Sequence, residues 1–468
     1  MNRRDFLRNT LATTALYSAG GLPGISNLAA ANGFAPINSR MLVNIMLDGG
    51  PDFRHLFAPA FDADTLSFGH RYWEANNTAH SIDGNANAWE QRWNQDYNPV
   101  GSAGYEFGIL NNSGWLQSMW DAGNVAIVSN VFGSSSRDHA ESKLIMDQGN
   151  RSSGQANSLR SGWGGRLAAA CDTNVVAVTR TPRPFCYGPH PDDPENRSGQ
   201  WLIPAQDVRD MRLFEASPDD SPRWSRPVIT RSLRSYYAVA SNELPSDSVY
   251  RRFANMERQL REIGEPLDVR MQNVPIPAEI AALYNDVQPA LENSYFGEQI
   301  RNLHDSIAAN DIFDMRIASL EYTGFDTHEG QRDGLETRLN DLFGTGKALD
   351  ALWQNLPADA RANTVFVLAG EFGRQIRSNG DAGTDHGEGT YVLLIGEGVN
   401  GGVYGDMYPE SELSRLDDPS PQIAGQTAID HVFGAVCDWM QPGSGSVVFP
   451  DRISAPIESG LNLAGLFA

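Results

Sequence analysis

The chain has 468 residues, of which 41% are hydrophobic and ten are Trp, so it can bury a large core and is not a disordered protein. Its formal net charge of −22 argues against nucleic acids and anionic membranes as partners, and favours solubility or the binding of cations. The three cysteines exclude a disulfide framework, although Cys171 and Cys186 could pair in an oxidising compartment, and Cys437 is expected in the core.

Residues 1–40 are interpreted as an export signal and a linker. Arg3 and Arg4 form a twin-arginine start, a weakly apolar run follows from Leu11, and Ala29–Ala31 offers a small-residue cleavage site. We therefore expect the twin-arginine translocation machinery to carry the folded protein to the periplasm or out of the cell. No later segment reaches about 18 apolar residues, so the mature chain is not expected to span a membrane.

Met41–Leu47 is a continuous apolar run that predicts a buried strand. The strand ends at Asp48, which is followed by Gly-Gly-Pro-Asp. A first strand that delivers an Asp and two glycines into a loop is common at metal or phosphate sites, but a turn with solvated carboxylates explains these residues equally well. Residues 54–108 are rich in Asn, Trp and Tyr without clean periodicity, and are expected to form a long surface excursion that acts as a lid or as a wall facing the substrate.

A second buried strand is predicted at Asn124–Ser129, after a short helix at Leu116–Asp121. A cluster of hydroxyl groups follows this strand and precedes His139; it consists of Ser134, Ser135 and Ser136. Hydroxyl groups between a strand and a helix can supply a nucleophile or hold an oxyanion, but serine is also an ordinary helix cap. The three serines and His139 are therefore candidate catalytic residues.

The segment of about 186–310 is expected to be an insertion, largely helical, that covers the sheet. It follows a strand predicted at Asn174–Thr179 and begins with a Pro-, Asp- and Trp-rich stretch. Ser232–Glu262 and Pro277–Ala309 are rich in Arg, Glu, Leu and Ala and poor in β-branched residues, which predicts helices.

The strand predicted at Met315–Tyr322 leads into Gly-Phe-Asp-Thr-His. In extended backbone residues i and i+2 face the same way, so Asp326 and His328 can bind one ion. The alternative is that these residues only cap the next helix. That helix is predicted at Leu335–Leu356, where leucines recur at helical spacing.

Thr364–Ala369 predicts a strand buried on both faces, and Glu371 and Arg374 follow it directly. A polar loop rich in Gly, Asn and Asp then leads to Asp-His-Gly, which contains His386. Ligands of open α/β sheets bind beyond the carboxyl ends of strands, so these are candidate site residues, with an ion pair beside a solvated loop as the alternative. A further strand at Tyr391–Ile395 and a helix at Ala428–Trp439 are expected to complete the fold.

Three separate residues are expected to converge on one divalent ion, with Asp48 and Glu371 close by. They are Asp326, His328 and His386. Imidazole nitrogens and a carboxylate suit zinc or manganese. The architectural expectation is that the four strands Met41–Leu47, Asn124–Ser129, Met315–Tyr322 and Thr364–Ala369 lie in one mainly parallel sheet with helices on both faces.

The motifs, in their order, resemble the bacterial family called domain of unknown function 1501. They are the twin-arginine start, Leu-Asp-Gly-Gly-Pro-Asp, Ser-Arg-x-His, Ser-Gly-Trp-Gly-Gly-Arg, Gly-Phe-Asp-Thr-His, Gly-Glu-Phe-Gly-Arg, Gly-Thr-Asp-His-Gly and Val-Asn-Gly-Gly-Val-Tyr-Gly. That family is in turn similar to the alkaline phosphatase and sulfatase superfamily. The resemblance implies an α/β protein with a three-layer α/β/α fold over residues 41–445, and it leaves 446–468 as a C-terminal tail.

The resemblance also implies roles for the candidate residues. Asp48 matches a metal ligand of the first strand, and one metal site is matched by Asp326, His328 and His386. Glu371 falls where the superfamily has an Asp-His pair, with Phe372 in the position of the His, so one ligand of a second metal site is missing. The nucleophile position falls among Ser134–Ser136.

The function expected from these residues is that of an exported metal-dependent hydrolase of phosphate or sulfate esters. A divalent cation (Zn, Mn or Ca) would hold the anionic substrate, a small molecule or a polymer, and lower the pKa of the nucleophile. Arg374 would neutralise charge in the transition state, and Glu371 would complete the shell of the cation or act as a base. The alternative is a non-catalytic periplasmic or cell-surface binding protein on a decayed hydrolase fold.

Overall fold

The computed structural model describes residues 33–102, 105–149, 157–211 and 266–468, together with 235–236, 239, 250 and 263–264. The twin-arginine motif and its cleavage region, and nearly all of the helix predicted at Ser232–Glu262, lie outside the described residues. Within these ranges, no helix has both the length and the apolar composition that crossing a membrane requires.

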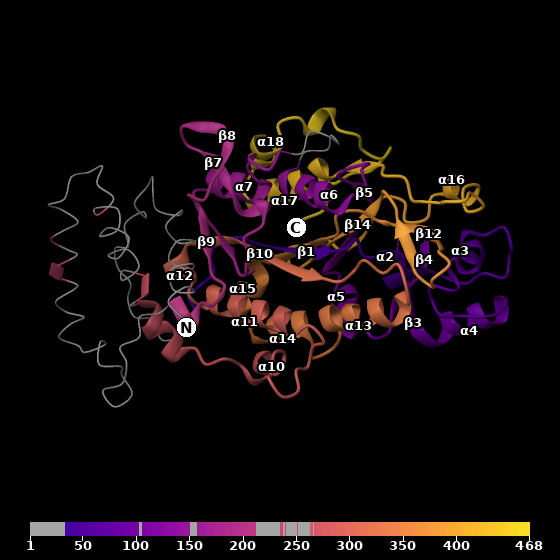
Figure 1. The fold of residues 1–468 in the computed structure, drawn as a ribbon, viewed down its shortest axis with the longest axis horizontal. Coiled ribbons are helices and arrows are strands. Elements are labelled where there is room, and N and C mark those ends of the chain that lie inside the picture. The colour runs from indigo at the N-terminus through magenta and orange to yellow at the C-terminus, as the bar shows by residue number, and fades with distance from the viewer. Residues whose placement is uncertain are drawn as a thin grey trace.

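A mixed, mostly parallel sheet forms the centre of the described part of the protein (Figure 1). Its strand order is β15-β5-β14-β11-β1-β10-β6-β9, and β16 also pairs with β5. The strands are β1 Met41–Asp48, β5 Val125–Phe132, β6 Asn174–Ala177, β9 Leu202–Pro204, β10 Met315–Thr323, β11 Thr364–Ala369, β14 Thr390–Ile395, β15 Gly402–Tyr404 and β16 Thr427–Ala428.

The predicted sheet is confirmed, because all four strands on which the prediction rests lie in it as β1, β5, β10 and β11. β1 pairs in parallel with both β10 and β11, whereas β14 runs antiparallel to its neighbours β11 and β5. Alternate residues of β1 enter two separate cores, Val43 and Ile45 on one face and Leu42 and Met46 on the other. Burial on both faces explains the continuous apolar runs of these strands.

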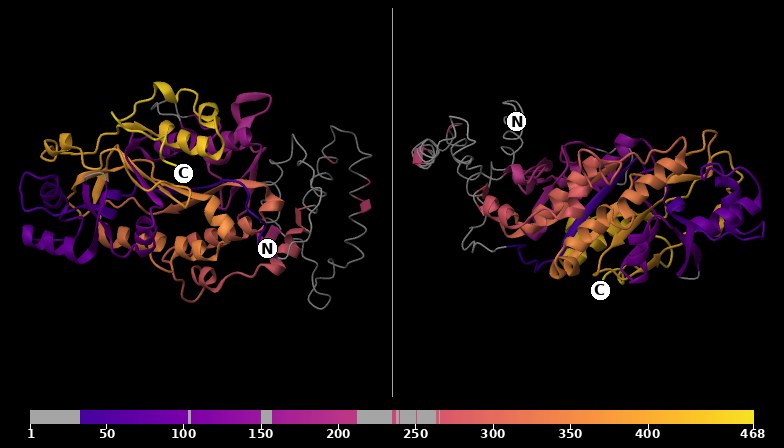
Figure 2. Two further views of the ribbon diagram at one scale, coloured as in Figure 1. Left: turned by 180° about the vertical axis from the view of Figure 1, so that it is seen from behind. Right: turned by 90° about the horizontal axis from the view of Figure 1, so that it is seen from below.

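Helices cover both faces of the sheet, an arrangement compatible with the expected three-layer fold. One face is covered by α5 Gly114–Asp121, α11 Ser294–Ala308, α13 Gln331–Phe343 and α14 Ala348–Asn355, and the other by α6 His139–Gln148, α7 Trp163–Cys171, α17 Ile429–Met440 and α18 Ser444–Val448. Figure 2 shows the same layers from behind, with the orange helices on one side of the sheet and the yellow and magenta helices on the other.

The expectation that residues 54–108 form a surface excursion is wrong. The segment contains α2 Phe53–Leu56, β2 Phe57–Pro59, α3 Phe68–Asn76, α4 Ala86–Asp96, β3 Tyr97–Ser102 and β4 Tyr105–Leu110, and the three strands form a small sheet of their own. Tyr72, Trp73 and Phe107 are fully buried in the same core as β1. Each element is too short to show a clear hydrophobic period, so the burial of the aromatic side chains could not be predicted from the sequence pattern.

The predicted helix Leu335–Leu356 is divided into α13 and α14. Gly344 ends α13, and Gly346 between the two helices has φ +72°, a backbone conformation that glycine adopts without strain. The leucine spacing correctly predicted a buried face on each of the two helices, since Leu339 in α13 and Leu352 in α14 are fully buried.

The region predicted as an insertion is described in part. It contains η1 Pro184–Cys186, β7 Gly188–His190, β8 Asp193–Ser198, η2 Arg209–Met211 and α10 Ala278–Ala282, in addition to β9 and α11. β9 pairs with β6 in the central sheet, and α11 packs on one face of that sheet. The remaining elements are α12 Asn310–Phe313, α15 Ala358–Asn363, α16 Glu410–Leu413, η3 Arg452–Ser454 and the two-stranded ribbon of β12 Arg374–Ser378 and β13 Thr384–His386.

The C-terminal residues pack against the main core. Leu466 is fully buried, the ring of Phe467 stacks on Trp439, and the backbone N–H of Ala468 donates to the carbonyl of Gly398. Cys171 and Cys186 are free thiols and do not form the disulfide considered from the sequence, and Cys437 is buried as predicted.

Candidate metal centre

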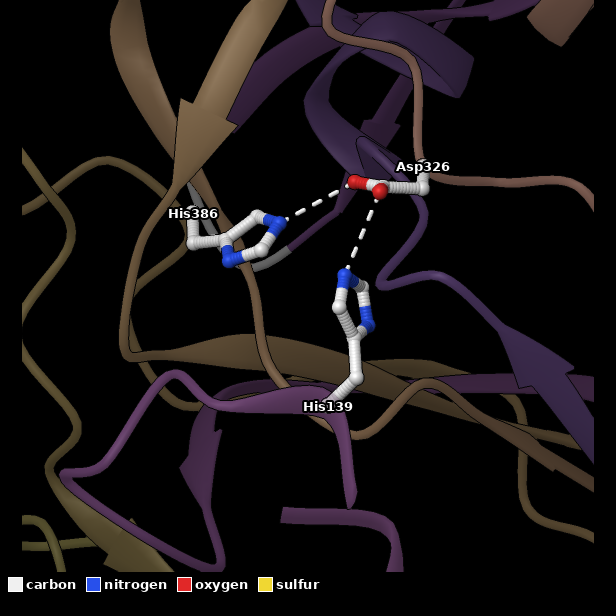
Figure 3. Close-up of side chains that lie close together, drawn as sticks. All are labelled: His139, Asp326 and His386. Carbon is white, nitrogen blue, oxygen red and sulfur yellow. Dashed lines mark hydrogen bonds and ion pairs between the residues drawn. The ribbon is translucent and has the colours of Figure 1, made fainter. Parts of the chain in front are cut away.

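Three neighbouring parallel strands deliver acidic residues to one edge of the sheet. β11, β1 and β10 are adjacent, and their carboxyl ends lead to Glu371, Asp48 and Asp326. Two histidines reach the same edge from other elements, His139 from the start of α6 and His386 from the end of β13. Figure 3 shows both imidazole rings pointing toward the carboxylate of Asp326.

Asp326, His328 and His386, called the Asp326 cluster below, converge on one point. The Nε2 atoms of His386 and His328 lie 3.0 and 3.1 Å from Oδ1 of Asp326, and 3.0 Å from each other. The structure therefore brings together the three side chains that the sequence predicted would share one ion. Their role as metal ligands stays a prediction.

The second nitrogen of each of these two histidines is held by a hydrogen-bond acceptor. Nδ1 of His328 lies 2.9 Å from Oδ1 of Asp385, and Nδ1 of His386 lies 2.9 Å from the carbonyl oxygen of Arg137. A carbonyl and an ionised carboxylate only accept, so each Nδ1 carries a proton, and in the neutral form of either ring the Nε2 atom presents its lone pair to Asp326. Asp385 was not predicted from the sequence, although its place directly before His386 could have suggested a partner for a ligand.

The charge states around Asp326 favour cation binding. Partial burial would raise the pKa of Asp326, but Arg374 and His386, both within hydrogen-bond distance of its carboxylate, lower it to about 2. Burial lowers the pKa of His386, and the nearby charge of Arg374 adds to this effect, against the influence of Asp326. The pKa of Asp385 is lowered by the hydrogen bond from Asn379 and then by that from His328. At neutral pH the cluster thus contains ionised Asp326 and neutral His386.

His139 connects the Asp326 cluster to a second group of charged residues. Its Nε2 lies 3.2 Å from Oδ2 of Asp326, and its Nδ1 lies 2.8 Å from Oε1 of Glu371. Among the described residues, two further sets of three are close enough to hold a cation, and both include this histidine: His139, Asp326 and His386, and also Asp48, His139 and Glu371. From the sequence, His139 was a catalytic candidate and not a metal ligand.

Asp48, Glu371 and Lys143 form the second group, called the Glu371 group below. Glu371 is 1% exposed and accepts hydrogen bonds from the backbone N–H groups of Gly49 at 3.0 Å and Gly50 at 3.1 Å. Asp48 pairs through Oδ1 with Nζ of Lys143 at 3.0 Å. Lys143 was missed from the sequence, although its position four residues after His139 places both side chains on one face of a helix.

The two glycines after Asp48 are required by close packing. Gly49 and Gly50 have φ of +119° and +69°. A Cβ on Gly49 would lie 2.3 Å from the backbone nitrogen of Asp326, and a Cβ on Gly50 would lie 2.5 Å from the ring of Phe372. Only glycine combines this backbone geometry with this proximity, and the turn aims both N–H groups at Glu371.

Arg374 lies beneath the site and not in it. The residue is 2% exposed, and its guanidinium donates to the carbonyl oxygens of Gly50 at 2.7 Å and Thr384 at 2.8 Å, and to Oδ1 of Asp326 at 2.5 Å. Further hydrogen bonds reach the carbonyl oxygens of Gly49 and Phe325. The predicted contact between Arg374 and the charge of a transition state does not fit this placement, because the guanidinium is buried and engaged. Its hydrogen bonds connect Asp326 to the surrounding loops.

The three candidate serines form the turn that precedes α6. Ser134 is buried, and its Oγ accepts a hydrogen bond from the N–H of Ser136 at 2.9 Å, whereas Ser135 is exposed. The cap of α6 is Asp138, whose Oδ1 accepts from the N–H of Glu141 at 2.9 Å, so the serines do not fill that role. They stand directly before His139 in the chain, and the nucleophilic role stays a prediction.

The fold and these groups together define an α/β protein with a candidate cation site at the carboxyl edge of a mostly parallel sheet. Residues 308–416 match the model of a family described as "Protein of unknown function (DUF1501)". This confirms the resemblance predicted from the motifs over a segment that contains Asp326, His328, Glu371, Asp385 and His386. A comparison with curated proteins gives no match.

Proposed function

We propose that this protein is an exported hydrolase of phosphate or sulfate esters that holds one divalent metal ion between Asp326, His328 and His386. The observation that carries the proposal is the convergence of two imidazole Nε2 atoms and one carboxylate oxygen within 3.1 Å of one another, with a hydrogen-bond acceptor beside each Nδ1. Lone pairs at such distances repel each other unless a proton or a metal cation lies among them.

The donor set fits zinc or manganese. Two imidazole nitrogens and one carboxylate oxygen match the ligands of these ions, whereas calcium takes oxygen ligands almost throughout. The acceptors behind His328 and His386 supply the outer contacts that orient metal-binding imidazoles in known sites. Zinc and manganese are therefore favoured over the calcium that the sequence analysis left open.

We assign only one ion to the site, because the chain itself neutralises the Glu371 group. Asp48 faces the ammonium of Lys143, and Glu371 faces two backbone N–H groups and His139. Partial burial would lower the pKa of Lys143, but the hydrogen bond and the charge of Asp48 raise it overall, so the ammonium is charged at neutral pH. Its partly exposed position suits an anionic oxygen of the substrate.

When bound, the ion would polarise the ester and stabilise a deprotonated hydroxyl nucleophile. His139 is suited to accept the proton of that hydroxyl: Glu371 takes the hydrogen bond of Nδ1–H, which leaves Nε2 to receive the proton, and Asp326 faces the imidazolium that results. The hydroxyl would come from Ser134, Ser135 or Ser136, which precede His139 in the same turn.

The test is metal analysis of the natively purified protein, followed by a screen of phosphate and sulfate monoesters and diesters. Chelator-treated protein receives Zn²⁺, Mn²⁺ or Ca²⁺ in separate assays. We expect about one equivalent of Zn²⁺ or Mn²⁺ and hydrolysis that returns with one of these ions. Stoichiometric metal without turnover of any ester would favour the non-catalytic binding protein, and protein without metal or turnover would remove the proposal.

Export is tested separately. Arg3→Lys combined with Arg4→Lys should leave the precursor in the cytoplasm, because the export machinery reads the arginine pair. Normal accumulation of this variant in the periplasm would show that the twin-arginine assignment is wrong.

A further inference from the structure

We infer that Gln331, the first residue of α13, is a positioning residue that fixes the relative places of the three loops carrying the candidate metal site. These loops are residues 48–52, from the last residue of β1 onward, residues 324–331, from the end of β10 to the first residue of α13, and residues 379–386, from the end of β12 through β13. The inference rests on the proposed metal site and adds a residue that contacts none of its ligand atoms.

One amide group touches all three loops. Oε1 of Gln331 accepts from the hydroxyl of Thr327 at 3.0 Å and from that of Thr384 at 2.6 Å, and Nε2 donates to Oδ2 of Asp52 at 2.9 Å. Thr327 stands between Asp326 and His328, Thr384 directly precedes Asp385 and His386, and Asp52 closes the loop that begins at Asp48.

The orientation of the amide is fixed by its partners. The carboxylate of Asp52 can only accept, and its other oxygen already caps the N–H groups of Arg54 at 3.1 Å and His55 at 3.3 Å. The NH₂ group of Gln331 must therefore face Asp52, which leaves the amide oxygen for the two hydroxyls. The opposite orientation would place two acceptor oxygens against each other.

Because the Gln331 amide and its partners are buried, other arrangements of these hydrogen bonds would leave polar groups without partners. Gln331 and Thr384 are 0% exposed, and Asp52 and Thr327 are 5% and 6% exposed. Water cannot replace a missing partner at this depth, so a shift of one loop against the others breaks a hydrogen bond that is not recovered.

Backbone hydrogen bonds connect two of the three loops directly. The loop 324–331 joins the loop 379–386 through Thr384 N–H to Thr327 O at 3.1 Å and Gln331 N–H to Ala382 O at 2.9 Å. The amide of Gln331 adds a contact between this pair and the far end of loop 48–52. Small movements of ligand-bearing loops weaken a metal site, because the ligands must meet at about one bond length from the ion.

The experiment compares Gln331→Met with Gln299→Met. Gln299 is an equally buried glutamine, whose side chain bonds the N–H of Glu321 at 2.9 Å and its carbonyl at 2.8 Å, away from the three loops. Zn²⁺ affinity is measured by competition with a chromophoric chelator, the site geometry by the visible spectrum of bound Co²⁺, and the fold by the Tm of the metal-free protein.

We expect both variants to lower the Tm, but only Gln331→Met to weaken Zn²⁺ binding, by about tenfold, and to change the Co²⁺ spectrum. Unchanged Zn²⁺ affinity and Co²⁺ spectrum in Gln331→Met, or equal losses in both variants, would overturn the inference and leave the metal site standing. A wild-type protein that binds neither ion would overturn the metal site and the inference together.

If Gln331→Met does not fold, Thr384→Val tests the same inference, since it removes one hydroxyl that bonds to Gln331 and preserves the shape of the side chain. The loss of this single hydrogen bond should weaken Zn²⁺ binding by about threefold. Unchanged Zn²⁺ binding in Thr384→Val would overturn the inference.

Discussion

The Asp326 cluster and the Glu371 group lie side by side at one edge of the sheet, and both contain carboxylates. They differ in how their negative charge is balanced. Glu371 faces the N–H groups of Gly49 and Gly50, and Asp48 faces Lys143. In the Asp326 cluster, the Nε2 atoms of two imidazoles point at a carboxylate that Arg374 holds from below. A set of acidic and histidine residues therefore indicates a cation site only when its acceptor atoms are left facing one another.

The two regions are also connected. His139 lies between Asp326 and Glu371, and Arg374 bonds to Asp326 and to the carbonyls of Gly49 and Gly50. Substitution of the shared residues should therefore affect both regions, whereas substitution of a residue in one region should affect that region alone.

The largest effect is expected for Arg374→Met, which removes the cation that both regions share. The free energy of unfolding should fall by about 3–5 kcal/mol, because Asp326 and several buried carbonyls lose their donor together. Urea denaturation in the presence of a chelator measures the change. Arg377→Met is the matched control, since Arg377 is less buried and bonds to the carbonyl of Leu416, and it should cost about 1 kcal/mol. Equal losses in the two variants would mean that Arg374 does not organise the site.

Removing a ligand should affect only the Asp326 cluster. His328→Ala and His386→Ala should each weaken Zn²⁺ binding by about 100-fold or more, beyond the usual effect of an outer contact. The fold should be retained, since both histidines are on the loops of the site and their side chains are 43% and 20% exposed. Competition with a chelator measures the affinity, and His431→Ala is the control because His431 bonds to Ala455 in another region. A His386→Ala variant that unfolds with unchanged metal content would show that His386 is structural.

A smaller effect is expected for Asp385→Asn, which changes the partner of His328 but no ligand. The neutral amide orients Nδ1–H less firmly than the carboxylate, so Zn²⁺ affinity should fall by about tenfold. Asp381→Asn makes the same change of charge in the same loop and should leave the affinity unaltered. If both variants lose affinity equally, the general charge of the loop, and not the contact with His328, is what matters.

The smallest effect on stability is expected for Lys143→Met, about 1 kcal/mol or less, because the ion pair with Asp48 is partly exposed. This variant tests why the Glu371 group holds no ion in our proposal. Without the ammonium, Asp48, His139 and Glu371 are close enough to bind a second cation, so the metal content should rise from one equivalent toward two. The control is Lys347→Met, at the other lysine of the chain, which should leave the metal content at one equivalent. A content of one equivalent in both variants would show that Lys143 does not replace a metal ion.

The sequence by itself determined the strands and the edge at which the site forms. The apolar runs of β1, β10 and β11 are long enough to be recognised locally, and Asp48, Asp326 and Glu371 follow each run within three residues of its last residue. Parallel neighbouring strands end at the same edge, so residues at their carboxyl ends meet without any further information.

The tertiary structure alone decided the function of each charged group. The acceptors that fix the imidazole protons, Asp385 and the carbonyl of Arg137, lie 57 and 249 residues from the histidines they bind. The burial of Arg374 and the pairing of Lys143 with Asp48 likewise depend on contacts between distant parts of the chain. A local sequence pattern reports which residue types follow a strand. Hydrogen-bond partners, and with them proton positions and charge balance, are set by distances that only the packed chain defines.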